Sequence, residues 1–158
     1  MPVLDFDRAR ALAADFHGRG LRIALTDGIF DLLHPGHVRY LRAARGEGDA
    51  LIVGVLSDRS VRETRGPSRP ITPEGERAEI VAALECVDAA VIVDDAPPHA
   101  LVMALRPDVL VTRADPATGP GAGADTLEST GCRVVRLPLE HRWSTGSIIE
   151  VIQRSARP

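Results

Sequence analysis

The segment 34–37 reads His-Pro-Gly-His, which places two imidazoles three residues apart. It follows an apolar run at 21–25 that is typical of a buried strand, and it leads into a stretch at 37–45 whose apolar positions recur with helical spacing. Pro35 favours the first turn of that helix, because the N–H that proline lacks has no intrahelical partner there. We therefore expect both imidazoles at a helix N-terminus, where unpaired N–H groups and a positive partial charge attract phosphate.

The chemistry of this pair favours a phosphate ligand over a metal ion. Histidines at this spacing also occur as metal ligands, but no acidic or thiol side chain stands beside His34 and His37 at helical spacing. An imidazole with an ordinary pKa of about 6.5 becomes cationic beside a polyphosphate and donates hydrogen bonds to its oxygens. The sequence therefore indicates phosphate binding at this turn.

Hydroxyl side chains begin a second helical pattern, at 144–154. Ser144, Thr145 and Ser147 lie in its first turn, with Gly146 among them. Such residues are ordinary N-caps, and capping alone explains them. The alternative is a second phosphate cradle, built from hydroxyl groups and backbone N–H groups.

Arginines gather in the segment 57–72, which the sequence predicts to be a long loop. All 19 basic side chains of the chain are arginines, so any phosphate contact from a basic side chain comes from arginine, which binds it bidentately. Arg62, Arg65 and Arg69 are candidates for such contacts, although a solvated basic surface is the alternative. Arg77 stands at the start of a helical pattern, where a cation is unfavourable unless an anion lies nearby.

Short apolar runs alternate with helical patterns along the whole chain. The runs lie at 21–25, 50–56, 89–93, 109–111 and 134–137, and the helical patterns at 5–16, 37–45, 73–84, 97–105, 125–130 and 144–154. This alternation predicts an α/β fold, a doubly wound (Rossmann-like) parallel sheet of five strands in a single domain. In such a sheet ligands bind beyond the carboxyl ends of the strands. The histidines, the arginines, the segment 112–115 and the hydroxyl residues at 144–147 all follow strand ends, so we expect them at one edge.

Composition narrows the possible functions. A net charge of −3 with 3 % aromatic residues gives no support for nucleic-acid binding. No apolar run approaches the roughly 20 residues of a membrane span. Cys86 and Cys132 form no metal-ligand cluster, and we expect two reduced core thiols in a cytoplasmic protein.

These residues together resemble the cytidylyltransferase-like superfamily of nucleotidyltransferases, whose hallmark is the His-x-Gly-His motif. The chain is most similar to heptose-1-phosphate adenylyltransferases, and more distantly to glycerol-3-phosphate and ethanolamine-phosphate cytidylyltransferases. The resemblance runs from about 21 to 152 and is carried by 28–41, 57–58, 68–70, 77–88 and 144–149. It implies one nucleotidyltransferase domain over 1–158, with 1–20 as an N-terminal helical extension.

The resemblance also implies a role for each site residue. His34 and His37 would be catalytic, stabilising the transition state and the leaving pyrophosphate. The implied nucleotide-binding residues are Asp27, Gly28, Ile29, Phe30, Arg62, Arg65, Thr112, Asp115, Ser144, Thr145 and Ser147. Arg69 and Arg77 would bind the acceptor. Mg²⁺ would accompany the nucleoside triphosphate, held mostly by phosphate oxygens and water, with its protein ligands unassigned.

The chain departs from its resembling branch at three places. The segment 112–116 reads Thr-Arg-Ala-Asp-Pro where the branch has Lys-Gly-Gly-Asp-Tyr, and Gly146 replaces a hydroxyl residue. Asp27 stands where the branch commonly has asparagine. A carboxylate near a triphosphate is unfavourable unless it meets Mg²⁺, a ribose hydroxyl or a sugar hydroxyl. The departures favour a stand-alone enzyme with a shifted acceptor.

The expected function is transfer of AMP from ATP to a sugar 1-phosphate resembling heptose 1-phosphate, with release of pyrophosphate. The alternative within this class is CMP transfer from CTP to a small alcohol phosphate such as glycerol 3-phosphate. A nucleotide-binding regulator without turnover is the alternative from another class. The expected partners are the nucleoside triphosphate, a phosphorylated small molecule and a second copy of the chain, with no nucleic acid and no membrane.

Overall fold

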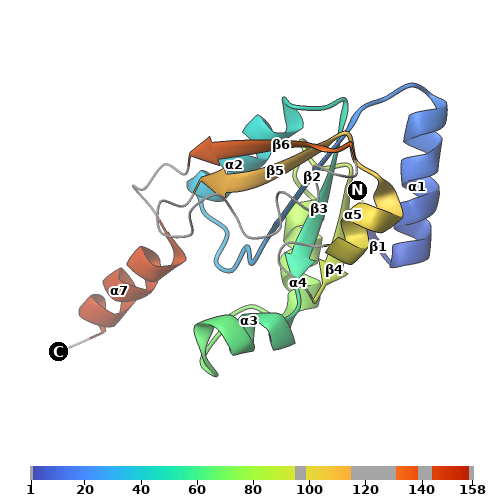
Figure 1. Cartoon of the computed structure of the whole chain (residues 1–158). Helices are drawn as coiled ribbons and strands as arrows, with labels where there is room; N and C mark the ends of the chain where they lie inside the picture. The colour runs from blue at the N-terminus through green and yellow to red at the C-terminus, as the bar shows by residue number, and fades with distance from the viewer. Residues whose placement is uncertain (1, 95–98, 115–130, 139–143, 157–158) are drawn as a thin grey trace.

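The computed structural model describes residues 2–94, 99–114, 131–138 and 144–156. Within them, a single sheet of six parallel strands has the order β1-β4-β3-β2-β5-β6 (Figure 1). The strands are β1 Val3–Leu4, β2 Ile23–Gly28, β3 Ala50–Leu56, β4 Ala89–Val93, β5 Val109–Ala114 and β6 Arg133–Pro138. The helices are α1 Phe6–Gly18, α2 Pro35–Arg45, α3 Asp58–Arg65, α4 Glu74–Ala82, α5 His99–Leu105 and α7 Thr145–Ser155.

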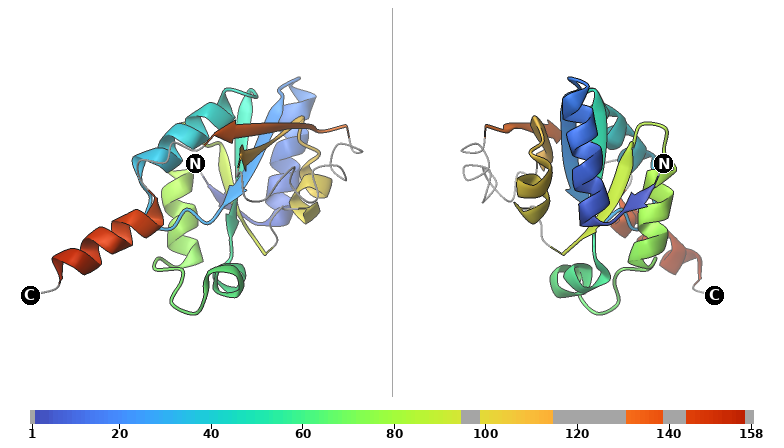
Figure 2. Two further views of the ribbon diagram at one scale, coloured as in Figure 1. Left: turned by 60° about the vertical axis from the view of Figure 1, so that its left-hand side comes forward. Right: turned by 90° about the vertical axis from the view of Figure 1, so that its right-hand side faces the viewer.

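Helices cover both faces of the sheet, which explains the continuous apolar runs of its strands. Figure 2 shows α2 and α4 on one face and α1 and α5 on the other. All seven residues of β3 are buried, because this strand is covered on both sides. The core therefore consists of two apolar layers, one on each face, as expected for a doubly wound α/β domain.

The site is positioned by the place where the winding of the sheet reverses. From β2 the chain continues to β3 and β4 on one side, and β5 and β6 pair on the other side. The carboxyl ends of β2 and β5 therefore lie side by side at this reversal. Ligands bind at such a switch point in open parallel sheets.

Two expectations from the sequence need correction. The sheet has a sixth strand, because Val3 and Leu4 of β1 pair with Ala90 and Val91 of β4, and two residues are too few to show a periodicity. The segment 57–72 is not a continuous loop, since it contains α3, which begins where the Ser57 side chain accepts a hydrogen bond from the Ser60 N–H. Val61 is the one buried apolar side chain on α3, so the helical pattern was weak.

The first residues of the chain are part of the sheet and its covering layer. Positions 1–20 were expected to be a helical extension, and the described part of them holds β1 and α1. α1 buries Ala9, Ala13 and Phe16 against the layer that also contains α5. The helix expected at 125–130 lies outside the described residues.

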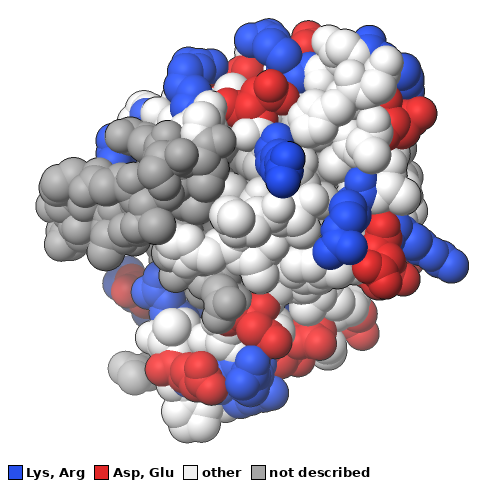
Figure 3. Space-filling model, turned by 45° about the vertical axis from the view of Figure 1, so that its right-hand side comes forward, with Lys and Arg blue, Asp and Glu red and all other residues white. Residues whose placement is uncertain are grey.

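Two surface observations bear on partners. On the face seen in Figure 3, acidic and basic side chains lie side by side around a region with few charges. Among the described helices, none combines the length and the apolar character that crossing a bilayer requires.

Candidate active site

A cavity of about 420 Å³ lies at the carboxyl ends of β2 and β5. Its walls come from the turn after β2, the first turn of α2, the end of α3, the end of β5 and the first turn of α7. The lining residues are Asp27, Gly28, Ile29, Phe30, Asp31, His34, His37, Tyr40, Arg65, Arg69, Arg113, Ser144, Thr145 and Gly146. Two helix N-termini therefore open onto one cavity, with three arginines beside them.

The two histidines lie face to face in this cavity. His34 is the N-cap residue of α2, and the N–H of His37 donates to its carbonyl oxygen at 2.9 Å. The two imidazole rings are stacked, with centroids 3.8 Å apart and planes inclined by 26°. Both Nδ1 atoms are buried, and neither has a hydrogen-bond partner among the described residues. The pair thus keeps buried hydrogen-bonding capacity that the fold itself does not use.

Burial keeps both rings neutral in the free protein at neutral pH. It lowers the pKa of His34. For His37, burial, the neighbouring His34 and the Arg113 guanidinium together lower the pKa to about 4. A bound polyphosphate would oppose these effects, because its negative charge favours the imidazolium form. The histidines therefore gain a proton most readily when an anionic ligand is present.

The turn between β2 and α2 has an unusual backbone. Phe30 and Leu32 have positive φ angles of 53° and 50°, a region that residues with a side chain seldom adopt. The Phe30 ring meets His37 edge to face, with centroids 5.4 Å apart. It also covers Gly28 so closely that a Cβ there would lie 2.9 Å from two ring carbons. Glycine at 28 therefore leaves the space that the Phe30 ring occupies beside His37.

Asp31 ties this turn to two other parts of the cavity wall. Its buried carboxylate pairs with the Arg69 guanidinium at 2.8 Å and accepts from the Ile71 and Thr72 N–H groups at 2.9 and 3.0 Å. Burial alone would raise the pKa of Asp31, but these three partners outweigh it and hold the pKa below its ordinary value. Its carbonyl oxygen accepts a hydrogen bond from the Thr145 hydroxyl at 2.7 Å. Asp31 therefore organises the site, and both of its carboxylate oxygens already accept hydrogen bonds.

Arg77 supports the cavity from behind. It is 1 % exposed, and its guanidinium donates to the carbonyl oxygens of Ile29 and Thr72 at 2.6 and 2.8 Å and to the Asp58 carboxylate at 2.7 Å. It does not line the cavity, so the structure does not place it where the expected acceptor contact would need it. The anion that a cation at this helix start requires is Asp58.

The first turn of α7 is capped by its own side chains. The Ser144 hydroxyl accepts from the Ser147 N–H at 3.1 Å, and the Ser147 hydroxyl accepts from the Ser144 N–H at 2.9 Å. This reciprocal arrangement is a capping box. Ser144, Thr145 and Gly146 line the cavity, whereas Ser147 does not. The capping role is thus confirmed, and the phosphate cradle, the alternative from the sequence, stays a prediction for a turn that lines the cavity.

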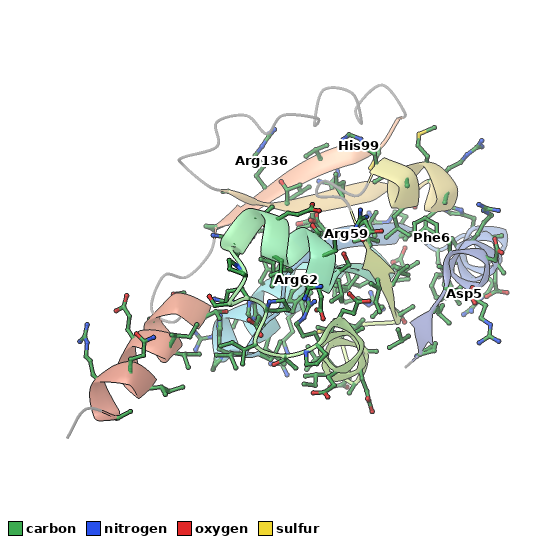
Figure 4. The ribbon with its side chains drawn as sticks, turned by 90° about the horizontal axis from the view of Figure 1, so that it is seen from below. Asp5, Phe6, Arg59, Arg62, His99 and Arg136 are labelled. Atoms are coloured by element: carbon green, nitrogen blue, oxygen red, sulfur yellow. The ribbon has the colours of Figure 1, made fainter. Side chains whose placement is uncertain are left out.

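Ten of the expected site residues line the cavity, and the others lie elsewhere. Arg62 is exposed on α3 (Figure 4), and Thr112 lies within β5. Asp115 lies outside the described residues. The lining residues that the sequence did not single out as ligand contacts are Asp31, Tyr40, Arg113 and Gly146.

Signals for two of these were present. Tyr40 stands one helical turn after His37, and its hydroxyl pairs with the Thr26 hydroxyl at 2.8 Å and the Val111 carbonyl at 3.2 Å. Burial raises the pKa of Tyr40 to about 12, so its hydroxyl stays neutral. Arg113 is the penultimate residue of β5, the strand that pairs with β2, and the switch point brings this strand end to the cavity.

The described residues contain no group of three or more His, Cys, Asp or Glu side chains arranged to hold a metal ion. Asp27 is the one carboxylate of the cavity lining without a hydrogen bond to another described side chain. A magnesium ion at this site would therefore fit only as a companion of the substrate phosphates, which supply most of its oxygen ligands.

A helix N-terminus with paired imidazoles, set at the switch point of a parallel sheet, defines a nucleotide-binding α/β domain of the Rossmann-like class. The sequence matches the family described as Cytidylyltransferase-like over residues 25–151. The chain belongs to this family, and it is a nucleotidyltransferase. The resemblance inferred from the His-x-Gly-His segment is thereby confirmed.

Named relatives agree with this assignment. The bifunctional protein HldE of Koribacter versatilis is 48 % identical over 139 residues, which are 88 % of this chain and 29 % of that protein. HldE of Syntrophotalea carbinolica is 48 % identical over 134 residues, 85 % of this chain and 27 % of that protein. The chain therefore spans less than a third of the length of these relatives. The crystal structure of a lipopolysaccharide core biosynthesis protein from Thermoplasma volcanium is similar, with a TM-score of 0.63 at 27 % identity, covering 77 % of this chain and 98 % of that one.

Proposed function

We propose that this nucleotidyltransferase transfers AMP from ATP to a sugar 1-phosphate of the heptose 1-phosphate type. An oxygen of the acceptor phosphate forms a bond to the α-phosphorus, the bond from the α-phosphorus to the bridging oxygen breaks, and pyrophosphate leaves with the electron pair. The observation that carries the proposal is the stacked histidine pair, which lines a cavity at a helix N-terminus and whose Nδ1 atoms have no hydrogen-bond partner among the described residues. The identity of 48 % with HldE proteins supports the choice of acceptor.

In this proposal each wall of the cavity binds a different part of the substrates. His34 and His37 stabilise the charge that develops at the reacting phosphate, and Arg65 and Arg69 neutralise the phosphates. The first turn of α7 offers backbone N–H groups to the β- and γ-phosphates. The backbone from Gly28 to Phe30 lines the nucleoside. Phosphoryl transfer of this kind depends on positioning and charge stabilisation, with little proton transfer.

Magnesium belongs to the proposal as a companion of the triphosphate. It supplies positive charge that lowers the cost of bringing the acceptor phosphate to the nucleotide. Asp31 is engaged by Arg69 and two N–H groups, so the protein's contribution is to hold the phosphates in place.

Pyrophosphate release measured with ATP, CTP, GTP and UTP over a panel of sugar 1-phosphates and alcohol phosphates tests the proposal. We expect ATP with a sugar 1-phosphate to give the highest kcat/KM, and His37→Ala serves as the inactive control. A clear preference for CTP with glycerol 3-phosphate would replace the proposal with its cytidylyltransferase alternative. Tight ATP binding without pyrophosphate release from any acceptor would indicate a regulator.

Two further points of the proposal concern assembly and location. A homodimer follows from the resemblance, and light scattering on the purified chain measures it. A cytoplasmic location is supported by Cys86 and Cys132, both free thiols in the structure. Fractionation of cells that produce the chain tests this location.

A further inference from the structure

Asp27 brings a negative charge into a cavity that we assign to phosphates. It precedes Gly28 at the carboxyl end of β2 and lines the cavity. Its carboxylate accepts no hydrogen bond from any other described side chain, in contrast to the saturated Asp31. An acceptor-only group in such a place needs a hydrogen-bond donor from a ligand, or it remains a costly charge.

The Asp27 side chain leaves β2 on the opposite side of the sheet from its neighbour Thr26. Side chains alternate along β2, and the neighbour Thr26 points to the α2 face, where it meets Tyr40. Asp27 is paired in register with Gly54 of β3, where an added Cβ would lie 3.4 Å from the Asp27 Cβ and 3.6 Å from Leu101 of α5. The Asp27 Cβ therefore lies on the side of the sheet that α5 covers, whereas the histidines lie on the side that α2 covers.

The charges around Asp27 select the kind of group that it accepts. Burial is the main cause that raises its pKa, to about 6, and the nearby Arg113 guanidinium acts in the opposite direction. The other ionisable groups lining the cavity are His34, His37 and Tyr40 on α2 and its N-cap, Asp31 in the turn, and Arg65 and Arg69. A phosphate is repelled by the carboxylate, and an ammonium group or a divalent cation is repelled by Arg113. A neutral hydroxyl is repelled by neither the Asp27 carboxylate nor the Arg113 guanidinium.

We propose that Asp27 is a specificity-determining residue, whose carboxylate accepts a hydrogen bond from a sugar hydroxyl of the substrates in the cavity. This inference rests on the proposed function, because it assumes that a sugar-bearing phosphate and a nucleotide occupy the cavity. The hydroxyl comes from the acceptor sugar or from the ribose of the nucleotide, and the experiment separates these two sources.

The experiment compares wild type, Asp27→Ala, Asp27→Asn and the control Glu79→Gln, which removes an exposed carboxylate from α4. Each protein is assayed for kcat/KM with a series of acceptor sugar 1-phosphates that each lack one hydroxyl, and with 2′-deoxy-ATP and 3′-deoxy-ATP. A hydrogen bond to a charged group contributes about 1.5–3 kcal/mol, which is roughly a 10- to 100-fold effect. We expect one deoxy compound to lose this factor with wild type and Glu79→Gln and less than about 2-fold with Asp27→Ala.

The identity of that compound assigns the source of the hydroxyl, the acceptor or the ribose. Asp27→Asn is nearly isosteric, so it keeps the fold while it removes the negative charge of the acceptor. A pH profile adds a second readout, because the wild-type KM for the affected substrate should rise as Asp27 gains its proton below pH 6. The Asp27→Asn profile should be flat over the same range.

Three results would overturn the inference. The first is equal sensitivity of wild type and Asp27→Ala to every deoxy compound. The second is an increase of the Mg²⁺ concentration for half-maximal rate in Asp27→Ala with no change in sugar discrimination, which would make Asp27 a metal ligand. The third is a wild-type preference for an amino-alcohol phosphate that Asp27→Ala loses.

Failure of the proposed function shows separately, as no pyrophosphate release by wild type. In that case calorimetric titration of the four proteins with ATP, its deoxy analogues and the sugar 1-phosphates still decides the inference. Equal dissociation constants for wild type and Asp27→Ala would refute it, and a loss confined to compounds that carry one particular hydroxyl would support it.

Discussion

The two helices that open onto the cavity begin in opposite ways. The N-cap residue of α2, His34, makes no side-chain hydrogen bond to its own helix, and its Nδ1 atom is buried without a partner. The first turn of α7 is closed by Ser144 and Ser147, whose hydroxyl groups and N–H groups satisfy each other. α2 buries Gly36, Tyr40, Leu41 and Ala44 in the core, whereas none of the described side chains of α7 is buried.

This difference indicates where each helix contributes to binding. The imidazoles of His34 and His37 line the cavity, and their Nδ1 atoms have no hydrogen-bond partner among the described residues, so we expect these rings to stabilise charge on a ligand. The hydroxyl groups at the start of α7 already stabilise the helix, and its contribution to a phosphate comes mainly from backbone N–H groups. α2 should therefore dominate catalysis, and α7 should affect binding.

The largest effect is expected from removing the support behind the turn that leads to α2. Arg77→Met leaves the Ile29 and Thr72 carbonyl oxygens and the Asp58 carboxylate without their buried partner. Loss of one member of a buried charged pair costs about 3–5 kcal/mol. We expect this loss in the free energy of unfolding measured with urea, and almost none for the control Arg136→Met on β6. A wild-type midpoint in Arg77→Met would show that the turn is held by other contacts.

Replacing either histidine of the α2 turn tests its catalytic role. His34→Ala or His37→Ala should lower kcat by about 10²–10³, the usual loss for one donor to a transition state. The control is His99→Ala, at the start of α5 and outside the cavity lining. Circular dichroism checks that the fold is retained. Unchanged turnover in either variant would contradict the role that the comparison gives to α2.

The burial of Asp27 in the cavity predicts a pH dependence of stability. The pKa of Asp27 is raised from 3.8 to about 6, so the folded state holds a proton that the unfolded state releases between these values. The stabilising effect of this proton is present at low pH and is lost as the pH rises through 6. Asp27→Asn should therefore unfold at a higher urea concentration than wild type at pH 7 and at the same concentration near pH 4.

The gain is limited by the size of the pKa shift. Each pKa unit corresponds to about 1.4 kcal/mol, so the gain is at most about 3 kcal/mol, and partial exposure of Asp27 reduces it. His37 is present in both proteins, so its own opposite dependence cancels in the difference. An equal midpoint at both pH values would show that the carboxylate is well solvated.

The smallest effect is expected at α7. Ser144→Ala removes the hydroxyl that accepts a hydrogen bond from the Ser147 N–H. This loss of the N-cap should destabilise the helix by about 1 kcal/mol. Because α7 buries none of its described side chains, the loss should appear as faster hydrogen exchange within α7 and leave the melting temperature of the domain unchanged. Ser155→Ala at the other end of the helix is the control. A fall of several degrees in the melting temperature would show that α7 is integrated with the core.

The sequence predicted the parts of the fold that depend on local patterns. Continuous apolar runs and the His-Pro-Gly-His segment were sufficient for the alternating sheet and for the helix that begins at Pro35. β1 was missed because Val3 and Leu4 gain their strand conformation from pairing with β4. α3 was missed because Val61 is its one buried apolar residue and a cap at Ser57, not a periodic pattern, begins it.

Site residues were predictable where the backbone alone positions them. Glycine at 28, the histidines and the start of α7 follow strand ends, and the fold brings them together. Arg77 shows the limit of this reasoning, since its place at a helix start correctly implied a nearby anion. Whether that anion was a ligand or Asp58 depended on tertiary packing, which a single sequence does not contain.

The hydrogen bond from the Thr145 hydroxyl to the Asp31 carbonyl has a consequence for how the enzyme opens. Among the described residues it is the one hydrogen bond between α7 and the rest of the domain, and it is made within the wall of the cavity. A substrate that binds the N-termini of both α2 and α7 would add a second contact between α7 and the rest of the domain. Release of pyrophosphate should then loosen α7 from the cavity. The rate of product release would therefore determine how fast this helix moves away from the site.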